Sequence, residues 1–463
     1  MKKTIKKMTL VMISCLLFMM VLVPSKSMTV NAKYEKSVLT YDFKYCQSES
    51  RAMLKMINDL RTGKDAWQYD KNNNKEYIKG LAALKYDYEL EKVAMQRAAE
   101  LVLMYDHLRP NGTYVFDLMS EYGSYGTAGE NIAYGTASFF NNASVFEAWK
   151  ETNAKYEGQG HRRNMLSRDY KTVGIACVEY AGYKHWVQVF SNAEWNTAKP
   201  TAAIDSTKTS KIEVYDDEIM SFIKRLYKLC LNRNYDSKGL TYWWTKLYTK
   251  QITAAEAARG FFVSKEMSDL KLNDNEFVER CYKVMMDRAP DKGGKKYWLD
   301  RIDNGMSREY VVKGFIDSKE FTNICNKYGM TKGTINVSEA RDKNYGITSF
   351  VARCYTKALG RKYDVNGLNF WCNKMLNASN VKQVAIDVAG NGFFHSKEFK
   401  DKKLSNSDYI KVLYRTFLGR EYDNNGLNYW LKELSSGKSR DYVLNGFANS
   451  KEFSDIMASY GIK

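Results

Sequence analysis

Four copies of one short pattern in the second half of the chain constrain its fold more than any other feature. The copies read LNRNYDSKGLTYWW, MDRAPDKGGKKYWL, LGRKYDVNGLNFWC and LGREYDNNGLNYWL. Each places Arg, Asp, Gly and Trp at the same offsets, and each is followed by Gly-Phe and then by SKEM or SKEF. Internal repetition of this kind is typical of repeated structural units that pack against their neighbours.

The spacing of the copies indicates that the unit was duplicated as a pair. The tryptophans lie 55, 73 and 59 residues apart, at Trp243, Trp298, Trp371 and Trp430. Only the second and fourth copies continue into the similar segments FTNICNKYGM and FSDIMASYGI. We therefore expect repeats 1 and 2 in residues 215–326, a linker at 327–346, and repeats 3 and 4 in residues 347–463.

The residues around each copy predict helices. Apolar residues precede the Arg at helical spacing, for example Phe222, Leu226 and Leu229 in repeat 1. The Asp-x-x-Gly step predicts a turn followed by a helix start. A calcium site at these Asp residues is the alternative, but the series of oxygen ligands that ends in a Glu is absent. We interpret the repeated Arg, with Asp three residues later, as a structural ion pair or a cap.

The first 32 residues have the layout of a secretory signal peptide. Early lysines precede an apolar run over residues 8–23, and Val30-Asn31-Ala32 resembles a cleavage site. The alternative is a retained membrane anchor, but a run of this length is shorter than the roughly 20 residues that a spanning helix needs. We expect an extracellular chain that begins near Lys33 and has no transmembrane span after cleavage.

The chain is basic. Its formal net charge is +18, and removal of the five lysines in residues 1–32, which include no acidic residue, leaves +13. Outside the cell, the anionic neighbours of such a chain are wall polymers and lipid head groups. No nucleic-acid-binding motif is present, so a nucleic-acid partner is not expected.

A change in composition divides the chain. The stretch NTAKPTAAIDSTKTSK, residues 196–211, has no large apolar residue except Ile204. A segment rich in Thr, Ala, Ser and Lys predicts a linker, which we place at residues 196–214. The upstream domain then occupies residues 33–195.

The upstream domain mixes predicted helices and strands. The segments RAMLKMINDLRTG, YELEKVAMQRAAELVLMYDHLRPNG and NNASVFEAWKETNAKY predict helices, and the second would carry His107 at its end. The glycine-rich segment GTAGENIAYG contains Glu130, and GHRRNML contains His161. The segments TVGIACVEY and HWVQVFS predict two strands that close the domain.

Five of these motifs, in this order, resemble the CAP superfamily of cysteine-rich secretory proteins, antigen 5 and pathogenesis-related 1, in its bacterial extracellular form. They are His-x-Arg-Pro-x-Gly, Gly-Glu-Asn-Ile-Ala, a Trp-containing helix, Gly-His-Arg-x-Asn-Met-Leu and Trp-Val-Gln-x-Phe. The resemblance covers about residues 46–195 and implies an α-β-α sandwich with a central cleft. The expected fold class is therefore α+β, with this sandwich followed by an all-α repeat region.

The resemblance also implies which residues line the cleft. The family's two histidines and two glutamates correspond to His107, Glu130, Glu151 and His161. Two neutral imidazoles can bind zinc or another divalent cation, while Glu130 and Glu151 would orient a histidine or take a proton in catalysis. The alternative for His161 is a helix cap or a polar network without an ion. We interpret Glu147 as a solvated helix residue and His185 as a rim residue.

The repeats resemble a family of unknown function found in secreted and surface-layer bacterial proteins and similar in fold to phycobilisome linker domains. That resemblance implies helical bundles with a binding or scaffolding role. The leading hypothesis is a cleft that binds a metal or a small or lipid ligand, carried on repeats that bind the cell wall, the cell surface or a protein. The alternatives are a metal-assisted, protease-like hydrolase and an effector that acts on host or neighbouring cells. No Gly-x-Ser-x-Gly or His-Glu-x-x-His motif is present.

Alignment of the repeats helps to interpret single residues. His395 aligns with Val263, Asp317 and Asn449, which predicts a plain surface residue. Cys230 aligns with Met285, Ala358 and Phe417, which predicts a buried apolar thiol.

An odd number of cysteines, seven, remains after signal removal. With Cys230 left unpaired, the economical bridges join Cys46 to Cys177, Cys281 to Cys325 and Cys354 to Cys372. A fully reduced chain is the alternative, since sequence alone does not fix connectivity.

Overall fold

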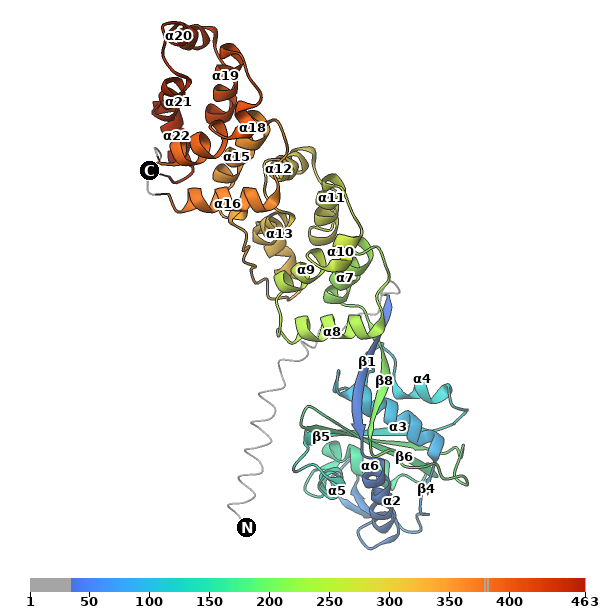
Figure 1. Ribbon diagram of the computed structural model, residues 1–463. Coiled ribbons are helices and arrows are strands. Elements are labelled where there is room, and N and C mark those ends of the chain that lie inside the picture. Colours follow the sequence, from blue (N-terminus) through green and yellow to red (C-terminus); the bar gives the residue numbers. More distant parts are fainter. Residues whose placement is uncertain (1–34, 379, 381–382, 463) are drawn as a thin grey trace. The chain divides into compact units, whose positions relative to one another are not determined.

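The computed structural model describes residues 35–378, 380 and 383–462 of the chain (Figure 1). The predicted signal peptide lies outside these residues. The chain forms two compact units, one of residues up to 217 with 236–242, and one of residues 218–235 with 243 onward. None of the helices in the described part of the chain is long and apolar enough to cross a membrane.

The first unit is built on a mixed sheet. Its strands are β1 (Lys36–Tyr45), β4 (Lys85–Tyr86), β5 (Ala128–Thr136), β6 (Thr172–Tyr180), β7 (Tyr183–Ser191) and β8 (Thr207–Tyr215). The order across the sheet is β5-β7-β6-β1-β8, and β4 pairs in parallel with β6. A separate hairpin joins β2 (Trp67–Tyr69) to β3 (Lys75–Tyr77). Strand β5 therefore lies at one edge of the sheet.

Helices cover both faces of this sheet (Figure 1). They are α2 (Gln47–Thr62), α3 (Tyr88–Leu101), α4 (Val115–Ser120), α5 (Asn142–Trp149) and α6 (Gly160–Leu166). Apolar side chains of α2, α5 and α6 share one core with every second residue of β6. Helix α3 packs on the opposite face, where a Cβ on Gly174 would overlap backbone atoms of Leu90. The predicted α-β-α sandwich is confirmed.

The predicted linker, residues 196–214, includes a strand. Its second half forms most of β8, which pairs antiparallel with β1 from Lys36↔Tyr215 to Lys44↔Thr207. Only Ile212 and Val214 are buried apolar residues of β8, because this edge strand exposes most of its length to solvent. The first unit thus extends to the end of β8, past the boundary expected at residue 195.

The predicted second helix also ends earlier than expected. Helix α3 stops at Leu101, and His107 lies in the loop that follows. The buried side chain of Arg97 donates a hydrogen bond to the carbonyl oxygen of Asp106 at 2.8 Å. This bond holds the loop back against the helix and so fixes the position of His107.

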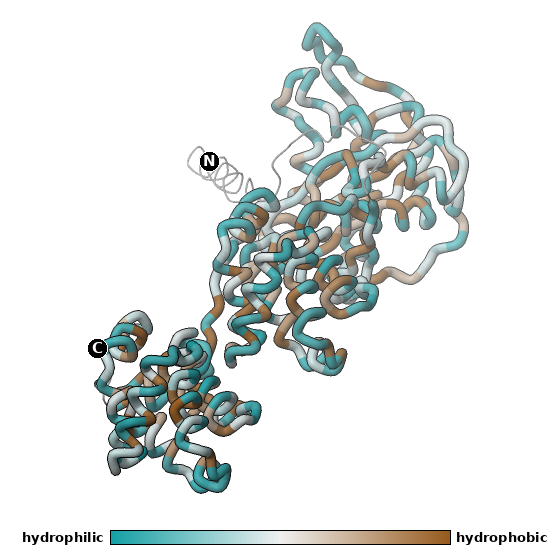
Figure 2. Tube along the Cα trace, turned by 90° about the horizontal axis from the view of Figure 1, so that it is seen from above, coloured by the Kyte–Doolittle hydropathy of each residue, from teal (hydrophilic) through white to brown (hydrophobic). Residues whose placement is uncertain are grey.

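The described residues of the second unit form helices and loops. In order they are α7 (Glu218–Arg225), η2 (Leu226–Cys230), α8 (Ser237–Tyr248), α9 (Ala254–Phe262), α10 (Lys265–Asp269), α11 (Asp274–Met285), α12 (Lys292–Asp303), α13 (Arg308–Asp317), α14 (Lys319–Lys327), η3 (Ala340–Asp342), α15 (Tyr345–Arg353), η4 (Cys354–Leu359), α16 (Val365–Leu376), η5 (Val384–Phe394), α18 (Lys397–Lys400), α19 (Asn406–Leu413), η6 (Tyr414–Leu418), α20 (Asn424–Ser435), α21 (Arg440–Ala448) and α22 (Lys451–Ser459). Hydrophobic and hydrophilic residues alternate along these helices (Figure 2), as expected for helices that bury one side.

The repeated polar residues stabilise the helices. In all four copies the Asp side chain accepts a hydrogen bond from the backbone N–H of the Gly three residues on, at 2.6–2.8 Å. This confirms the predicted turn and helix start. The repeated Arg pairs with the Glu of the SKE segment, in the pairs Arg233–Glu266, Arg288–Glu320, Arg361–Glu398 and Arg420–Glu452. The ion pair was expected, but its main partner is this Glu.

The repeated tryptophan and the glycine of Gly-Phe form one packing contact. A Cβ on the glycine would meet the indole in each copy, in the pairs Trp243–Gly260, Trp298–Gly314, Trp371–Gly392 and Trp430–Gly446. The glycine is therefore required because the tryptophan occupies the space of its side chain.

The seven cysteines of the described chain are all free and buried. The three bridges predicted from sequence are therefore absent, and the reduced alternative describes this structure. Cys46 and Cys177 do lie side by side, because the N–H of Cys46 donates to the carbonyl of Cys177 at 3.0 Å and the two thiols hydrogen-bond. Cys230 is fully buried, as predicted.

Candidate functional site

The first predicted histidine is paired with the first predicted glutamate. His107 follows α3, and Glu130 lies in β5 at the edge of the sheet. The Nδ1 atom of His107 donates a hydrogen bond to Oε2 of Glu130 at 2.7 Å. The Glu130 side chain is only 3% exposed, whereas that of His107 is 55% exposed. A buried carboxylate thus holds an imidazole that reaches solvent.

Buried arginines hold this carboxylate in place. Arg97 of α3 donates from Nε to Oε1 of Glu130 at 2.7 Å and pairs with Glu100 at 2.9 Å. Arg109 donates to both carboxylate oxygens of Glu100, at 3.0 Å each. Burial lowers the pKa of Arg97, but the attraction of Glu130 and Glu100 outweighs it and leaves that pKa raised. The Arg97 guanidinium is therefore permanently charged and anchors Glu130.

The second histidine has the same arrangement with its own glutamate. His161 lies in α6, and Glu151 follows α5 with a left-handed backbone at φ +46°. The Nδ1 atom of His161 donates to Oε1 of Glu151 at 2.6 Å, and the N–H of Arg162 donates to Oε2 at 3.2 Å. The indole of Trp149, the last residue of α5, lies 6.2 Å from the His161 ring.

Strand β5 connects the two histidine–glutamate pairs. The side-chain amide of Asn131, next to Glu130, donates to the carbonyl of His161 at 3.1 Å. The amide of Asn164 in α6 donates to the backbone carbonyl of Glu130 at 3.2 Å and to Asn131 at 2.8 Å. The four predicted site residues therefore belong to one hydrogen-bonded network around the edge of the sheet.

Both imidazoles use Nδ1 for a carboxylate, which leaves Nε2 of each ring for another ligand. This is the arrangement in which metal-binding histidines are held by protein carboxylates. Within the described residues, no group of three or more His, Cys, Asp or Glu side chains is placed to hold a metal ion. The hydrogen bond to Glu130 raises the pKa of His107 above its ordinary 6.5, although burial acts against it.

The sequence interpretation of Glu147 agrees with the structure, whereas that of His185 does not. Glu147 is solvated as expected, with a side chain that is 63% exposed and pairs with Lys150. His185 is not a rim residue, because it is 5% exposed within β7. It stacks on Tyr134 with ring centres 5.8 Å apart, and burial lowers its pKa to about 4. It lies on the sheet face that carries Glu130.

Comparison with known families identifies two regions of the chain. The Cysteine-rich secretory protein family, abbreviated CAP, matches residues 54–190. Residues 54–190 are a CAP family domain. A second family, described as a domain of unknown function (DUF4214), matches residues 210–271, 267–325 and 390–457. The helical region after the CAP domain therefore contains DUF4214 repeats in three matched segments, and both family resemblances seen in the sequence are confirmed.

Individual relatives match only part of this chain. The uncharacterized protein YkwD of Bacillus subtilis (strain 168) is 32% identical over 121 residues, which is 26% of this chain and 43% of YkwD. The chain thus spans less than half the length of this curated relative. Among solved structures, an outer surface protein from Borrelia burgdorferi is 21% identical, with a TM-score of 0.23, over 31% of this chain and 92% of that one. NaASP2, solved with Zn²⁺, is 20% identical, with a TM-score of 0.25, over 33% and 86%.

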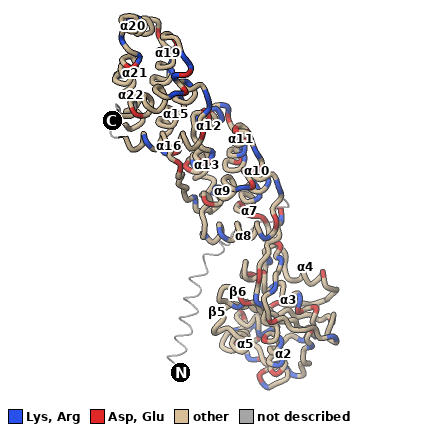
Figure 3. Tube along the Cα trace, in the orientation of Figure 1, with Lys and Arg blue, Asp and Glu red and all other residues tan. Residues whose placement is uncertain are grey.

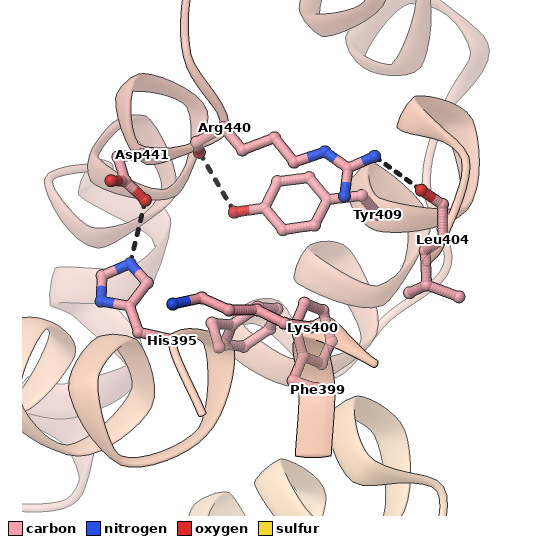
Figure 4. Close-up of a pocket in the computed structure, with 8 residues that line it drawn as sticks. His395, Phe399, Lys400, Leu404, Tyr409, Arg440 and Asp441 are labelled. Carbon is pink, nitrogen blue, oxygen red and sulfur yellow. Dashed lines mark hydrogen bonds and ion pairs between the residues drawn. The ribbon is translucent and has the colours of Figure 1, made fainter. Parts of the chain in front are cut away.

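Outside the CAP domain, a cavity of about 170 Å³ lies within repeats 3 and 4 (Figure 4). Phe394, Phe399 and Tyr409 supply aromatic walls. His395 lines it as well and bonds Oδ1 of Asp441 through Nε2 at 2.9 Å. His395 is therefore half-buried and bonded to a carboxylate, which corrects its interpretation as a plain surface residue.

Sequence reasoning missed the two residues that stabilise the site most directly. Arg97 and Glu100 lie within the apolar face of α3, between Ala94 and Leu101, and both are buried. Charged residues at apolar-face positions of a helix are rarely buried unless paired. Two opposite charges, three residues apart on the apolar face of this helix, could therefore have identified Arg97 and Glu100 as a buried ion pair.

Proposed function

We propose that this chain is a bacterial extracellular CAP protein whose histidine–glutamate site binds a divalent cation and whose repeats attach it to a cell-wall or surface polymer. One observation carries the first part of the proposal. Two imidazoles, His107 and His161, are each held through Nδ1 by a carboxylate, so that each presents Nε2. Zinc and similar cations bind neutral imidazole at such an atom and complete their coordination with water.

The state of the carboxylates favours binding over hydrolysis. Glu130 uses one oxygen for Arg97 and the other for His107. Glu151 likewise uses one oxygen for His161 and the other for the N–H of Arg162. A general base needs a carboxylate oxygen within reach of the proton that it removes. Because each glutamate holds a histidine through Nδ1, we assign both an orienting role.

Zinc titration of the full chain tests the site. We expect binding of about one ion, and loss of that binding in the double variant His107→Ala/His161→Ala. The matched control is His395→Ala, because His395 also bonds a carboxylate but lies in the repeats. Unchanged zinc affinity in the double variant would refute the assignment of His107 and His161 as cation ligands. If the double variant still binds a lipid or another small ligand, a ligand-binding cleft would be the better description of the site.

The proposed attachment rests on the surface of the repeats. Lys and Arg are distributed along their helices, interspersed with Asp and Glu (Figure 3). The Lys of each SKE segment is exposed, at Lys265, Lys319, Lys397 and Lys451. In repeats 1, 3 and 4 the side chain of this Lys is 87–88% exposed. Each of these three lysines also pairs with an exposed Asp four residues on, at 2.6 Å. Four exposed cations at equivalent positions suit an anionic polymer.

Binding of the full chain to envelope fractions tests the attachment. Replacing the four SKE lysines with Gln should weaken binding, and rising salt should weaken it in the unmodified chain because exposed charges are screened. The matched control replaces four exposed lysines of the CAP domain with Gln, at Lys55, Lys64, Lys71 and Lys79. Equal effects of the two variants would show that the charge of the whole chain, and not the repeats, directs binding.

A further inference from the structure

The residue before each repeat tryptophan is aromatic and exposed. The four residues are Tyr242, Tyr297, Phe370 and Tyr429, on helices α8, α12, α16 and α20. Their exposed fractions are 53, 45, 54 and 53%. One exposed aromatic residue is ordinary on a protein surface. An exposed aromatic residue at the same position of four equivalent helices indicates a role that the four repeats share.

Packing explains the other shared residues of these segments but does not require a ring here. The Asp caps its helix, the Arg pairs with Glu, and the Trp packs on Gly, as described above. The exposed ring meets the Trp beside it edge to face, with ring centres 5.0 Å apart for Phe370 and Trp371 and 4.9 Å for Tyr429 and Trp430. A leucine would cover the same edge of the indole, whereas only an aromatic residue offers a flat face to a ligand.

A cation lies one helical turn beyond the ring in three of the four repeats. These residues are Lys246, Arg301 and Lys374, and repeat 4 has Glu433 at the same position. The guanidinium carbon of Arg301 lies over the Tyr297 ring, 3.2 Å from its centre, and Nζ of Lys374 lies over the Phe370 ring at 5.1 Å. In these two repeats the cation therefore covers one face of the ring, and a sugar would stack on the other. Ring and cation together suit a unit that has both a flat C–H face and an acidic group.

We propose that the repeats bind an acidic polysaccharide, with one sugar ring stacked on the exposed aromatic residue of each repeat. This inference rests on the proposed attachment to a surface polymer and names the chemistry of that polymer. A polymer of repeating units can present the same contact to four equivalent sites, and four weak contacts on one chain add to a strong one. A protein partner instead favours a contiguous apolar patch, whereas a charged residue lies one helical turn from each of these rings.

The test compares the unmodified full chain with the variant Tyr242→Leu/Tyr297→Leu/Phe370→Leu/Tyr429→Leu. The probe is alginate, a polymer of uronic acids, with dextran as the neutral polymer and oligo(dT) as the nucleic acid, at about 0.15 M salt. We expect alginate affinity to fall by about ten-fold or more in the leucine variant. The variant with Gln at the four SKE lysines should lose less, because it keeps the rings. Circular dichroism and thermal unfolding check that the leucine variant folds, and the four single variants should each show a smaller loss.

Each outcome separates this inference from the proposed attachment. Unchanged alginate affinity in the folded leucine variant would overturn the role of the rings, and so would binding to oligo(dT) in preference to alginate. If the chain binds envelope fractions equally with and without the rings, the attachment stands and the ring inference fails. If alginate binding depends on the rings but the chain does not bind envelope fractions, the ring inference stands and the proposed attachment fails.

Discussion

Nδ1 of His107 lies 2.7 Å from Oε2 of Glu130, a carboxylate that is 3% exposed and bonded on its other oxygen by Arg97. Arg97 thus fixes the position of Glu130 independently of the histidine. The histidine, in contrast, is half-exposed and reaches solvent with its other nitrogen. The buried, rigidly held Glu130 carboxylate therefore fixes the orientation of the half-exposed His107 ring.

The first prediction concerns the pKa of His107. The hydrogen bond to Glu130 raises it above 6.5, so the folded state holds this proton more tightly than the unfolded chain. The resulting stabilisation is fully present below pH 6.5 and is lost as the pH rises through the raised pKa. In Glu130→Gln we expect the pKa of His107 to fall, as measured by NMR titration. An unchanged pKa in that variant would show that Glu130 does not hold the imidazole.

The second prediction concerns acid stability and His185. Burial lowers its pKa to about 4, so the unfolded chain binds a proton more readily below pH 6.5. Stability should fall as the pH drops from about 6.5 to 4, by on the order of 3 kcal/mol from this group. His185→Phe should remove that part of the acid sensitivity, as seen in denaturant unfolding at several pH values. An identical pH dependence in the variant would contradict the neutral buried state.

The four candidate site residues could be read from the sequence, but their structural surroundings could not. His107, Glu130, Glu151 and His161 belong to short motifs with fixed order, which are readable without a structure. The pairing of β1 with β8 joins residues that are more than 160 positions apart, and β8 offers only two buried apolar residues as a signal. Local patterns cannot report such a contact, so residues 207–214 resembled a linker.

The third prediction concerns the packing of the repeats. Gly314→Ala should place a methyl group against the indole of Trp298 and destabilise the second unit by about 1–3 kcal/mol. The control in the same repeat is Gly293→Ala in α12, whose Cβ would meet nothing closer than 3.5 Å. That change should be neutral or stabilising, because alanine favours helix over glycine. Similar losses in both variants would argue against the tryptophan–glycine contact.

The exposed aromatic residues show a second limit of sequence reasoning. Repetition identifies Tyr242 and Trp243 equally well as shared positions, and both residue types favour burial. Only the structure separates them, because Trp243 packs on Gly260 and Phe261 whereas Tyr242 is 53% exposed. A helix turns by about 100° per residue, so adjacent residues can face opposite environments.

The fourth prediction concerns the thiols. All seven cysteines of the described chain are free and buried, so a thiol reagent should react slowly with the folded protein. After denaturation it should count seven thiols in a chain without residues 1–32, which contain the eighth cysteine, Cys15. The hydrogen bond from Cys177 lowers the pKa of Cys46, whereas burial raises that of Cys177. Cys46 should therefore react first, and Cys46→Ser should remove the fastest phase. A count of one would instead support the three bridges expected from sequence.

The central claim is that His107 and His161 present Nε2 to a divalent cation while their Nδ1 atoms stay bonded to glutamates. The chain has only four histidines, so ¹⁵N labelling of histidine gives a spectrum in which every imidazole can be assigned. On addition of zinc, the account predicts that the Nε2 resonances of His107 and His161 shift together while their Nδ1 atoms stay protonated. His185 and His395 should not change. Shifts at His395, shifts at neither site histidine, or loss of the Nδ1 protons would contradict the account.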